Sequence, residues 1–147
     1  MKLGIRNEQE LKIALEELKA DFGKGRILAQ KTASGVEMIC GMKKDNVFGA
    51  FLIFGLGGIF VEVLKDITFA ILPINQAQAH RMITKLKGYS IFKGYRGQEP
   101  LYTEKVIELL LNVSELVQKE SQIKEINLNP IFVSEKEVAV ADAKITI

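Results

Sequence analysis

The chain has 147 residues, of which 48% are hydrophobic and 26% are charged. This length allows one domain with a hydrophobic core, and this composition excludes an intrinsically disordered chain. The 20 basic and 18 acidic residues leave a net charge of +2, which gives no electrostatic case for nucleic-acid binding, since that needs a strongly basic face.

Cysteine and histidine occur once each, as Cys40 and His80. A disulfide within the chain, a cysteine-based zinc site and a cluster of several histidines are therefore excluded. The apolar stretches are broken by glycine and fall short of the roughly 20 residues that span a bilayer. The first residues lack the charged-then-apolar pattern of a secretion leader. We therefore expect a cytoplasmic domain with no membrane partner and no nucleic-acid partner.

An amphipathic helix is predicted over residues 7–22. Asn7 can cap its first turn, and Glu10, three positions later, can return the hydrogen bond. The helix carries an apolar stripe, formed by Leu11, Leu15, Leu18 and Phe22. After the glycines that end this helix, residues 26–31 are predicted to form a short strand.

Four more apolar runs follow, and each has the length of a short strand. They are predicted at residues 36–42, 48–54, 59–64 and 68–72. The sequence FGLGG at 54–58 breaks this pattern, with Gly57 and Gly58 next to each other. Glycine weakens a strand, so either the backbone turns tightly here or another group approaches it closely.

The second half of the chain predicts two helices and two strands. Asn75 can cap the first of these helices, with Gln78 in the return position. In chain order we expect a helix from Asn75 to about Leu86, a loop at 88–100, a helix at 103–120 and strands at 123–133 and 138–145. The fold class is α+β, with one domain over 1–147, a largely antiparallel sheet and helices on one face.

The two last strands predict a specific pair of side chains. If a tight turn centres on Glu135 and Lys136, Val133 faces Val138, and Asn129 faces Asp142. Opposed residues have Cβ atoms about 4.5 to 5.5 Å apart. On this register Asn129 lies on the same face of its strand as Ile131 and Val133, and Asn127 and Lys144 extend that face. An amide oxygen and a carboxylate so placed are suitable ligands for magnesium.

This prediction leaves alternatives open. Glu-Lys is not a favoured two-residue turn, so a longer loop would shift the register. Asn129 can instead begin a bend before Pro130, and Asp142 can lie at a sheet edge. Asn127 and Lys144 can be a solvated strand end.

Other polar residues are each compatible with a binding site or with an ordinary surface. FGLGG lacks the spacing of a phosphate loop and is followed by strand residues, which favours a hairpin turn or bulge over a phosphate loop. Glu62 and Glu37 are single acids in apolar strands, and Gln30 ends a strand. The loop GYSIFKGYRGQEP can bind an anion or be solvated.

Five blocks in order resemble one known family. These are ILAQKTASGVEMICGMKKD, FGLGGIFVEVLKD, FKGYRGQEP, INLNPIFV and VADAKI. Together they are similar to the NDP-forming acyl-CoA synthetases, of the ADP-forming acetyl-CoA synthetase type, and more distantly to the beta chain of succinyl-CoA synthetase. The resemblance implies the larger subdomain of an ATP-grasp fold. It also implies a ligase that converts acyl-CoA, ADP and phosphate to acid, CoA and ATP through a phosphohistidine.

The same resemblance implies roles for single residues. Asn129 and Asp142 match the two magnesium ligands, and Gln30 matches a position beside the adenine. Positions near the nucleotide and its phosphates are matched by Glu37, Gly57, Gly58 and Glu62. The implied cofactors are Mg²⁺ and ATP or ADP. No catalytic residue is carried over, because His80 lies outside the relay motif of the family.

Departures from the family pattern imply dependence on a partner. The chain begins, by resemblance, after the histidine segment, so the N-terminal grasp subdomain is expected to be absent. Asn127 also stands where relatives more often have an acid. We expect a part that is inactive alone and acts with a CoA-binding, phosphohistidine-carrying chain, and an exposed apolar or glycine-rich face that allows self-association. The alternatives are a non-catalytic ATP-grasp-like module for assembly or nucleotide sensing, and an unrelated small structural domain.

Overall fold

The computed structural model describes residues 2–58, 65–94, 97 and 99–147. Contacts divide the chain into two compact units, Met1–Thr32 and Ala33–Ile147. Each unit is described by itself below. The prediction of a single domain over 1–147 stays a prediction.

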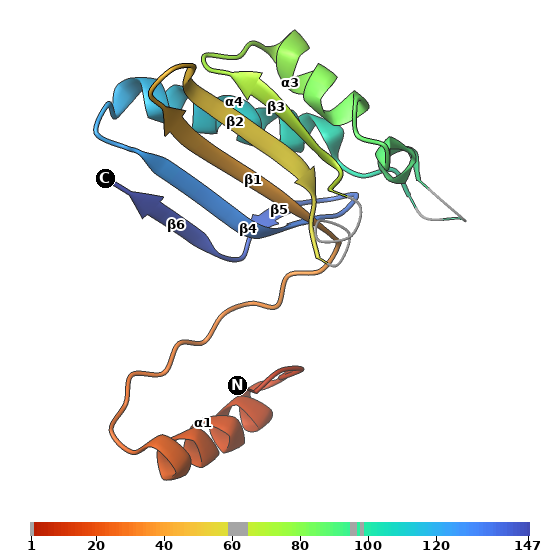
Figure 1. The fold of residues 1–147 in the computed structure, drawn as a ribbon. Helices are drawn as coiled ribbons and strands as arrows, with labels where there is room; N and C mark the ends of the chain where they lie inside the picture. Colours follow the sequence, from red (N-terminus) through yellow and green to blue (C-terminus); the bar gives the residue numbers. More distant parts are fainter. Residues whose placement is uncertain (1, 59–64, 95–96, 98) are drawn as a thin grey trace. The chain divides into compact units, whose positions relative to one another are not determined.

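The first unit is built on helix α1, Glu8–Phe22, as the sequence predicted (Figure 1). The Asn7 side chain accepts a hydrogen bond from the backbone N–H of Glu10 at 2.9 Å. Gly23 ends the helix with a positive φ of 68°, a conformation that glycine adopts without steric cost. The short strand predicted at 26–31 is wrong, because these residues form no strand. A strand needs a neighbour for its backbone hydrogen bonds, and the described part of this unit has only the helix.

The second unit contains a six-stranded sheet with the order β3-β2-β1-β4-β5, in which β6 also pairs with β4. All strand pairings among the described residues are antiparallel. The strands are β1 (Val36–Asp45), β2 (Gly49–Leu56), β3 (Ile67–Ile71), β4 (Glu125–Val133), β5 (Val138–Val140) and β6 (Ala143–Thr146). This sheet confirms the predicted α+β class and the largely antiparallel pairing.

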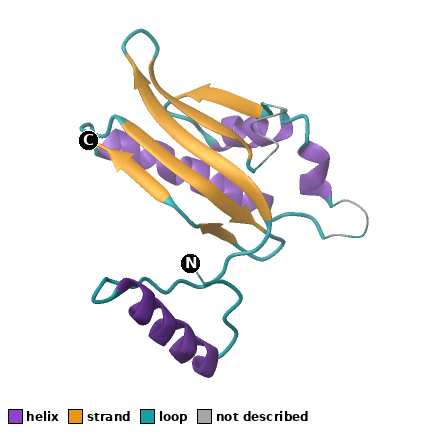
Figure 2. Ribbon diagram, turned by 60° about the horizontal axis from the view of Figure 1, so that its bottom comes forward, coloured by secondary structure: helices purple, strands orange, loops and turns teal. Residues whose placement is uncertain are grey.

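The helices of the second unit lie on one face of this sheet (Figure 2). They are α3 (Gln76–Thr84), the short 3-10 helix η1 (Tyr89–Lys93) and α4 (Thr103–Lys119). Both directions of the predicted capping box are present, because Asn75 and Gln78 each accept from the other's backbone N–H at 2.9 Å. The core between sheet and helices includes Phe54, Ile83 and Leu110, which are all fully buried.

Most predicted element boundaries are confirmed within a few residues. The predicted final strand divides into β5 and β6. The strand predicted at 59–64 lies outside the described residues. No helix in the described part of the chain is long and apolar enough to cross a membrane.

Candidate functional site

The register of the last hairpin agrees with the one that the sequence predicted. The two-residue turn is closed by a hydrogen bond from the Ser134 N–H to the Glu137 carbonyl, at 3.0 Å. Val133 pairs with Val138 in β4 and β5. Farther along, the N–H of Asn129 donates to the carbonyl of Asp142 at 3.1 Å. The backbones of these two residues therefore meet, as the count across the turn required.

One part of the hairpin prediction is wrong, and a β-bulge explains why. Met38 of β1 pairs with Ile131, whereas Cys40 pairs with Leu128. β4 therefore carries one residue more than β1 in this interval, at Asn129 and Pro130. Leu128 and Ile131 are both buried, but Asn129 is exposed. Asn129 thus does not share a face with Ile131, because the bulge changes which side chains of β4 point to the core.

The bulge leaves Asn129 in an accessible position, and its backbone is hydrogen-bonded to that of Asp142. Both residues are exposed. Among the residues that the structure describes, no hydrogen bond or ion pair involves either side chain. An amide oxygen and a carboxylate without other partners are hard oxygen donors, and Mg²⁺ is typically bound by one or two such groups with water and substrate phosphates. The donor set of this pair therefore fits magnesium.

A second cluster brings Glu37 together with the adjacent glycines. The N–H of Gly57 donates to the carbonyl of Glu37 at 2.7 Å. A Cβ added to Gly57 would lie 2.8 Å from the carbonyl carbon of Glu37. A Cβ added to Gly58, which has φ +62°, would lie 2.9 Å from Oε2 of Glu37. Only glycine allows the backbone after β2 to lie this close to the acid.

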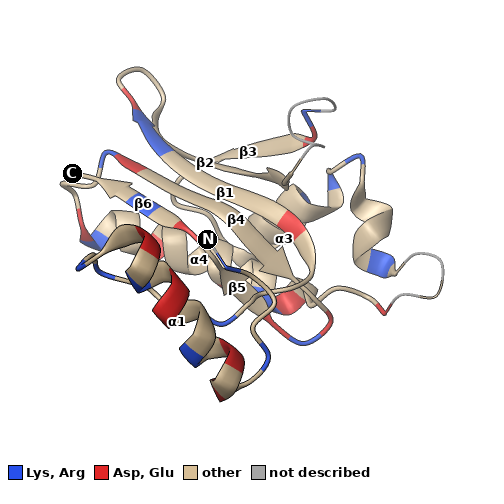
Figure 3. Ribbon diagram, turned by 90° about the horizontal axis from the view of Figure 1, so that it is seen from below, with Lys and Arg blue, Asp and Glu red and all other residues tan. Residues whose placement is uncertain are grey.

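The two clusters lie near each other along β1 and β4. Glu37 pairs with Phe132, and Ile39 lies opposite the bulge at Asn129. Two residues along a strand span about 7 Å, so Glu37 is within a few strand positions of the Asn129–Asp142 pair. Lys43 and Lys44 lie toward the hairpin end of β1, whereas Glu37 is near its beginning (Figure 3). Glu37 is thus nearer along β1 to the bulge than Lys43 and Lys44 are.

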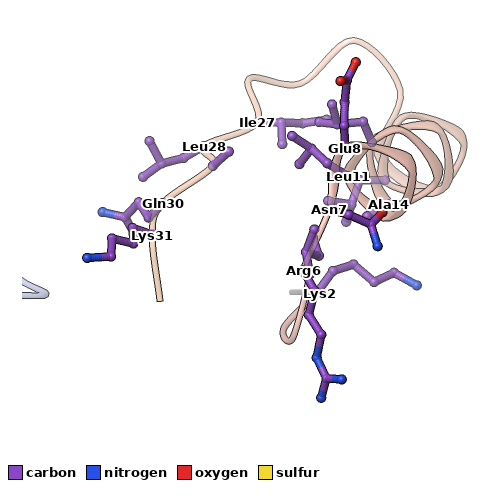
Figure 4. Close-up of a pocket in the computed structure, with 14 residues that line it drawn as sticks. Lys2, Arg6, Asn7, Glu8, Leu11, Ala14, Ile27, Leu28, Gln30 and Lys31 are labelled. Carbon is purple, nitrogen blue, oxygen red and sulfur yellow. The ribbon is translucent and has the colours of Figure 1, made fainter. Parts of the chain in front are cut away.

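Gln30 belongs to the first unit and lines a cavity there. The cavity has a volume of about 570 Å³ and lies between α1 and the extended segment that includes Gln30 (Figure 4). Leu11 and Ala14 line it from the helix, and Ile27 lines it from the segment. Since the units are described separately, Gln30 is assigned no position relative to Glu37.

The remaining predicted residues have simple locations. Asn127 pairs with Lys144 between β4 and β6, and both are exposed. Glu62 lies outside the described residues. Asp66 was missed by sequence reasoning, although it is only 3% exposed and accepts two backbone hydrogen bonds. The sequence signal was one acid before a strand, and such an acid is usually on the surface.

Known proteins resemble this chain over nearly all of its length. A family model described as an ATP-grasp domain matches residues 1–147. The beta subunit of ADP-forming acetate–CoA ligase II from Pyrococcus furiosus is 42% identical, over 99% of this chain and 66% of that protein. ADP-forming acetate–CoA ligase II from Archaeoglobus fulgidus is 38% identical, over 99% of this chain and 21% of that protein.

The solved structures include a similar fold with a bound nucleotide analogue. Acetyl-coenzyme A synthetase 1 of Ca. Korarchaeum cryptofilum, in complex with coenzyme A and Mg-AMPPCP, has a TM-score of 0.84 and 33% identity, over 99% of this chain and 67% of that chain. This chain thus spans about two thirds of the Pyrococcus and Korarchaeum chains, and about a fifth of the Archaeoglobus protein.

Proposed function

The chain belongs to the ATP-grasp domain family, and from that premise we propose that it is the nucleotide- and magnesium-binding part of an ADP-forming acyl-CoA synthetase. The whole enzyme would convert acyl-CoA, ADP and phosphate to the free acid, CoA and ATP. We propose acetyl-CoA as the acyl-CoA, because the similar proteins are named as acetate–CoA ligases and acetyl-CoA synthetases. A cytoplasmic location agrees with the single, buried cysteine.

The observation that carries this proposal is the opposition of Asn129 and Asp142 across the last hairpin. Their backbones are joined by a 3.1 Å hydrogen bond, and both residues are exposed. In the proposed site the Asn129 amide oxygen and the Asp142 carboxylate hold Mg²⁺. When bound, Mg²⁺ supplies positive charge that neutralises the phosphate oxygens during phosphoryl transfer. The backbone hydrogen bond keeps the two residues opposite each other, so both donors can reach one metal ion.

Further contacts to the nucleotide would come from the glycine cluster. Gly57 and Gly58 lack side chains, so a nucleotide phosphate can approach their backbone closely. By resemblance to the family, we assign Glu37 to the nucleotide site, Glu62 to a role near the phosphates and Gln30 to the adenine. Lys144, which pairs with Asn127 next to the bulge, adds a positive charge near the bound phosphates.

The chain requires other parts to complete a turnover. It spans only about two thirds of the Pyrococcus subunit, and His80 on α3 is exposed and forms part of an open groove with Ile107. We therefore assign the phosphoryl relay to a separate CoA-binding, phosphohistidine-carrying partner. The proposed chain binds the nucleotide and orients its phosphates toward that partner.

Calorimetric titration with ATP and with ADP, each with and without Mg²⁺, tests the proposal. We expect binding that depends on Mg²⁺. Asp142→Ala should weaken it by at least about tenfold, because even changes to the outer partners of a metal typically cost that much.

The matched control is Glu108→Ala. Glu108 is an exposed acid on α4 that forms an ion pair with Lys105 at 2.7 Å, so this change also removes one surface carboxylate. It should leave ATP affinity unchanged. Absence of ATP and ADP binding in all conditions would contradict the proposal and favour a non-catalytic module. Equal losses of ATP affinity in Asp142→Ala and Glu108→Ala would indicate that Asp142 is not a metal ligand.

A further inference from the structure

Asp66 joins two segments that are distant in the sequence. It precedes β3, and its carboxylate is turned into the protein, with 3% exposure. One oxygen accepts the N–H of Lys87 at 2.8 Å, and the other accepts the N–H of Gly88 at 2.7 Å. Both N–H groups lie beyond the end of α3, so the helix supplies no backbone acceptor for them. The carboxylate therefore fixes the start of the segment that leads into η1.

The backbone of Asp66 also holds the end of β2. Its carbonyl accepts the N–H of Leu56 at 3.2 Å. A Cβ added to Gly55 would lie 2.5 Å from that carbonyl oxygen. A Cβ added to Gly88 would lie 2.5 Å from Cδ1 of Leu56 and 3.2 Å from Oδ2 of Asp66. Three segments are thus packed together at this point without space for another carbon.

The residue before Asp66 has an unusual backbone conformation. Lys65 is the one described non-glycine residue with a positive φ, at 46°. Its carbonyl accepts the N–H of Ile67 at 3.0 Å, which makes a very tight turn. This turn brings the chain into β3 with the Asp66 side chain directed to the core. A side chain in this backbone region carries a steric cost, and the two hydrogen bonds of Asp66 offset that cost.

The segments that meet at Asp66 are the ones that carry candidate binding groups. Leu56 is followed directly by Gly57 and Gly58, which pack on Glu37. Gly88 is followed directly by η1, and at its end the Lys93 ammonium lies 5.2 Å from the ring centroid of Tyr89. Asp66 is in neither binding segment, but it is hydrogen-bonded to the chain just before each of them.

We propose that Asp66 is a positioning residue that sets the placement of the glycine segment and of η1 together, and through them the affinity for the nucleotide phosphates. This inference rests on the proposed function for its ligand, but the placement itself does not depend on it. Both oxygens of the carboxylate are needed for this placement, because each accepts one backbone N–H. An amide in its place has one acceptor and one donor, so one backbone N–H would face another N–H and be left unpaired.

The test compares Asp66→Asn with a matched control elsewhere in the core. Ser114 is 2% exposed, and its hydroxyl oxygen accepts the N–H of Ile74 at 3.1 Å. Ser114→Ala therefore also removes a buried acceptor from a backbone N–H, but it is remote from both segments. Gly88→Ala is a second variant at the junction. It keeps the carboxylate and displaces the end of the flexible Leu56 side chain, so it remains informative if Asp66→Asn does not fold.

Two readouts are measured on folded protein: hydrogen exchange of the peptides that contain residues 55–58 and 86–94, and affinity for Mg²⁺–ATP by calorimetry. Asp66→Asn should accelerate exchange in both peptides and weaken ATP binding about tenfold, which corresponds to about 1.4 kcal/mol. Gly88→Ala should also accelerate exchange in the two peptides and weaken ATP binding. Ser114→Ala should lower thermal stability and leave both peptides and the affinity unchanged.

Each outcome bears on a separate claim. Faster exchange in only one peptide, or unchanged exchange in both, overturns the joint placement. Faster exchange in both peptides with wild-type ATP affinity overturns the link to the phosphates. A wild-type chain that binds no nucleotide overturns the proposed function and that link with it, while the exchange measurement still decides the joint placement.

Discussion

Gly57 illustrates how one residue without a side chain determines the local arrangement of two strands. An added Cβ would lie 2.8 Å from the carbonyl carbon of Glu37 and 2.9 Å from the N atom of Met38. Both are backbone atoms, which cannot rotate away. We predict that Gly57→Ala lowers the free energy of unfolding by about 1–3 kcal/mol, the usual cost of overpacking, as measured by urea denaturation.

Gly41 provides a control in the middle of β1. The nearest atom to an added Cβ is the Ile126 carbonyl oxygen at 3.5 Å, which is an ordinary contact. Gly41→Ala should therefore have little effect on stability. If both variants are equally stable, the close approach between Gly57 and Glu37 is not a constraint on the fold.

Cys40 gives a pH dependence with a defined sign. It is fully buried, and desolvation raises the pKa of its thiol to about 12. The unfolded chain releases this proton from about pH 9, whereas the folded chain keeps it. Between these pH values the unfolded state binds fewer protons, so the folded state loses stability as the pH rises, by up to about 1.4 kcal/mol per pH unit.

We therefore predict that wild type loses more stability than Cys40→Ala between neutral pH and about pH 10, by about 1 kcal/mol. Urea denaturation at several pH values measures both free energies. Lysines and tyrosines also titrate in this range, but they are present in both proteins. A free-energy difference between the two proteins that is independent of pH would contradict this prediction.

Residue partners were predictable where they depended on local geometry. The pairing of Asn129 with Asp142 follows from counting across a two-residue turn, so the sequence contained enough information. The burial of Asp66 depends on the end of α3, more than 20 residues away, and no local pattern indicates it. The bulge at Asn129 was also missed, because it is defined by the pairing of β4 with the distant β1.

At the scale of elements, the N-terminus of α3 depends on a reciprocal pair of hydrogen bonds. Asn75 and Gln78 each accept from the other's backbone N–H at 2.9 Å. We predict that Asn75→Ala lowers the free energy of unfolding by about 1 kcal/mol, since the cap satisfies a backbone donor that the helix cannot. Urea denaturation tests this, and Gln76→Ala at the exposed first helical position is the control. Equal effects of the two changes would exclude a specific role for the cap.

Helices and strands were predictable from sequence when all the residues that determine them lie within the segment itself. α1 and α3 have both a cap and an apolar stripe, and their starts were predicted correctly. The segment 26–31 has the apolar residues of a strand but no neighbouring strand to pair with. It forms no strand in the structure. Strand formation depends on pairing with another segment, whereas a capped helix satisfies most of its own backbone groups.

At the scale of the whole molecule, the sheet has an exposed apolar edge. Thr68 donates to the Met82 carbonyl of α3 at 3.1 Å, so its neighbours Phe69 and Ile71 point to the opposite face of the sheet. They are 60% and 61% exposed. The ring of Phe69 also packs against Phe51, with centroids 6.4 Å apart. An apolar patch of this kind is typical of an interaction surface.

We predict that this patch lets the isolated chain self-associate. Sedimentation should detect a concentration-dependent dimer for wild type and mostly monomer for the double variant Phe69→Ser and Ile71→Ser. The control is Leu116→Ser, which changes an apolar residue that is 37% exposed on α4. A wild-type chain that stays monomeric at high concentration would contradict the prediction.

Nuclear magnetic resonance with Mn²⁺–ATP in place of Mg²⁺–ATP measures whether Asn129 and Asp142 hold the metal of a bound nucleotide. Because paramagnetic broadening falls steeply with distance, we predict that the amide signals of Asn129 and Asp142 broaden at the lowest Mn²⁺ concentrations. The signal of Lys105 on α4 should stay sharp. Broadening that is centred elsewhere, or that is unchanged in Asp142→Ala, would contradict the account.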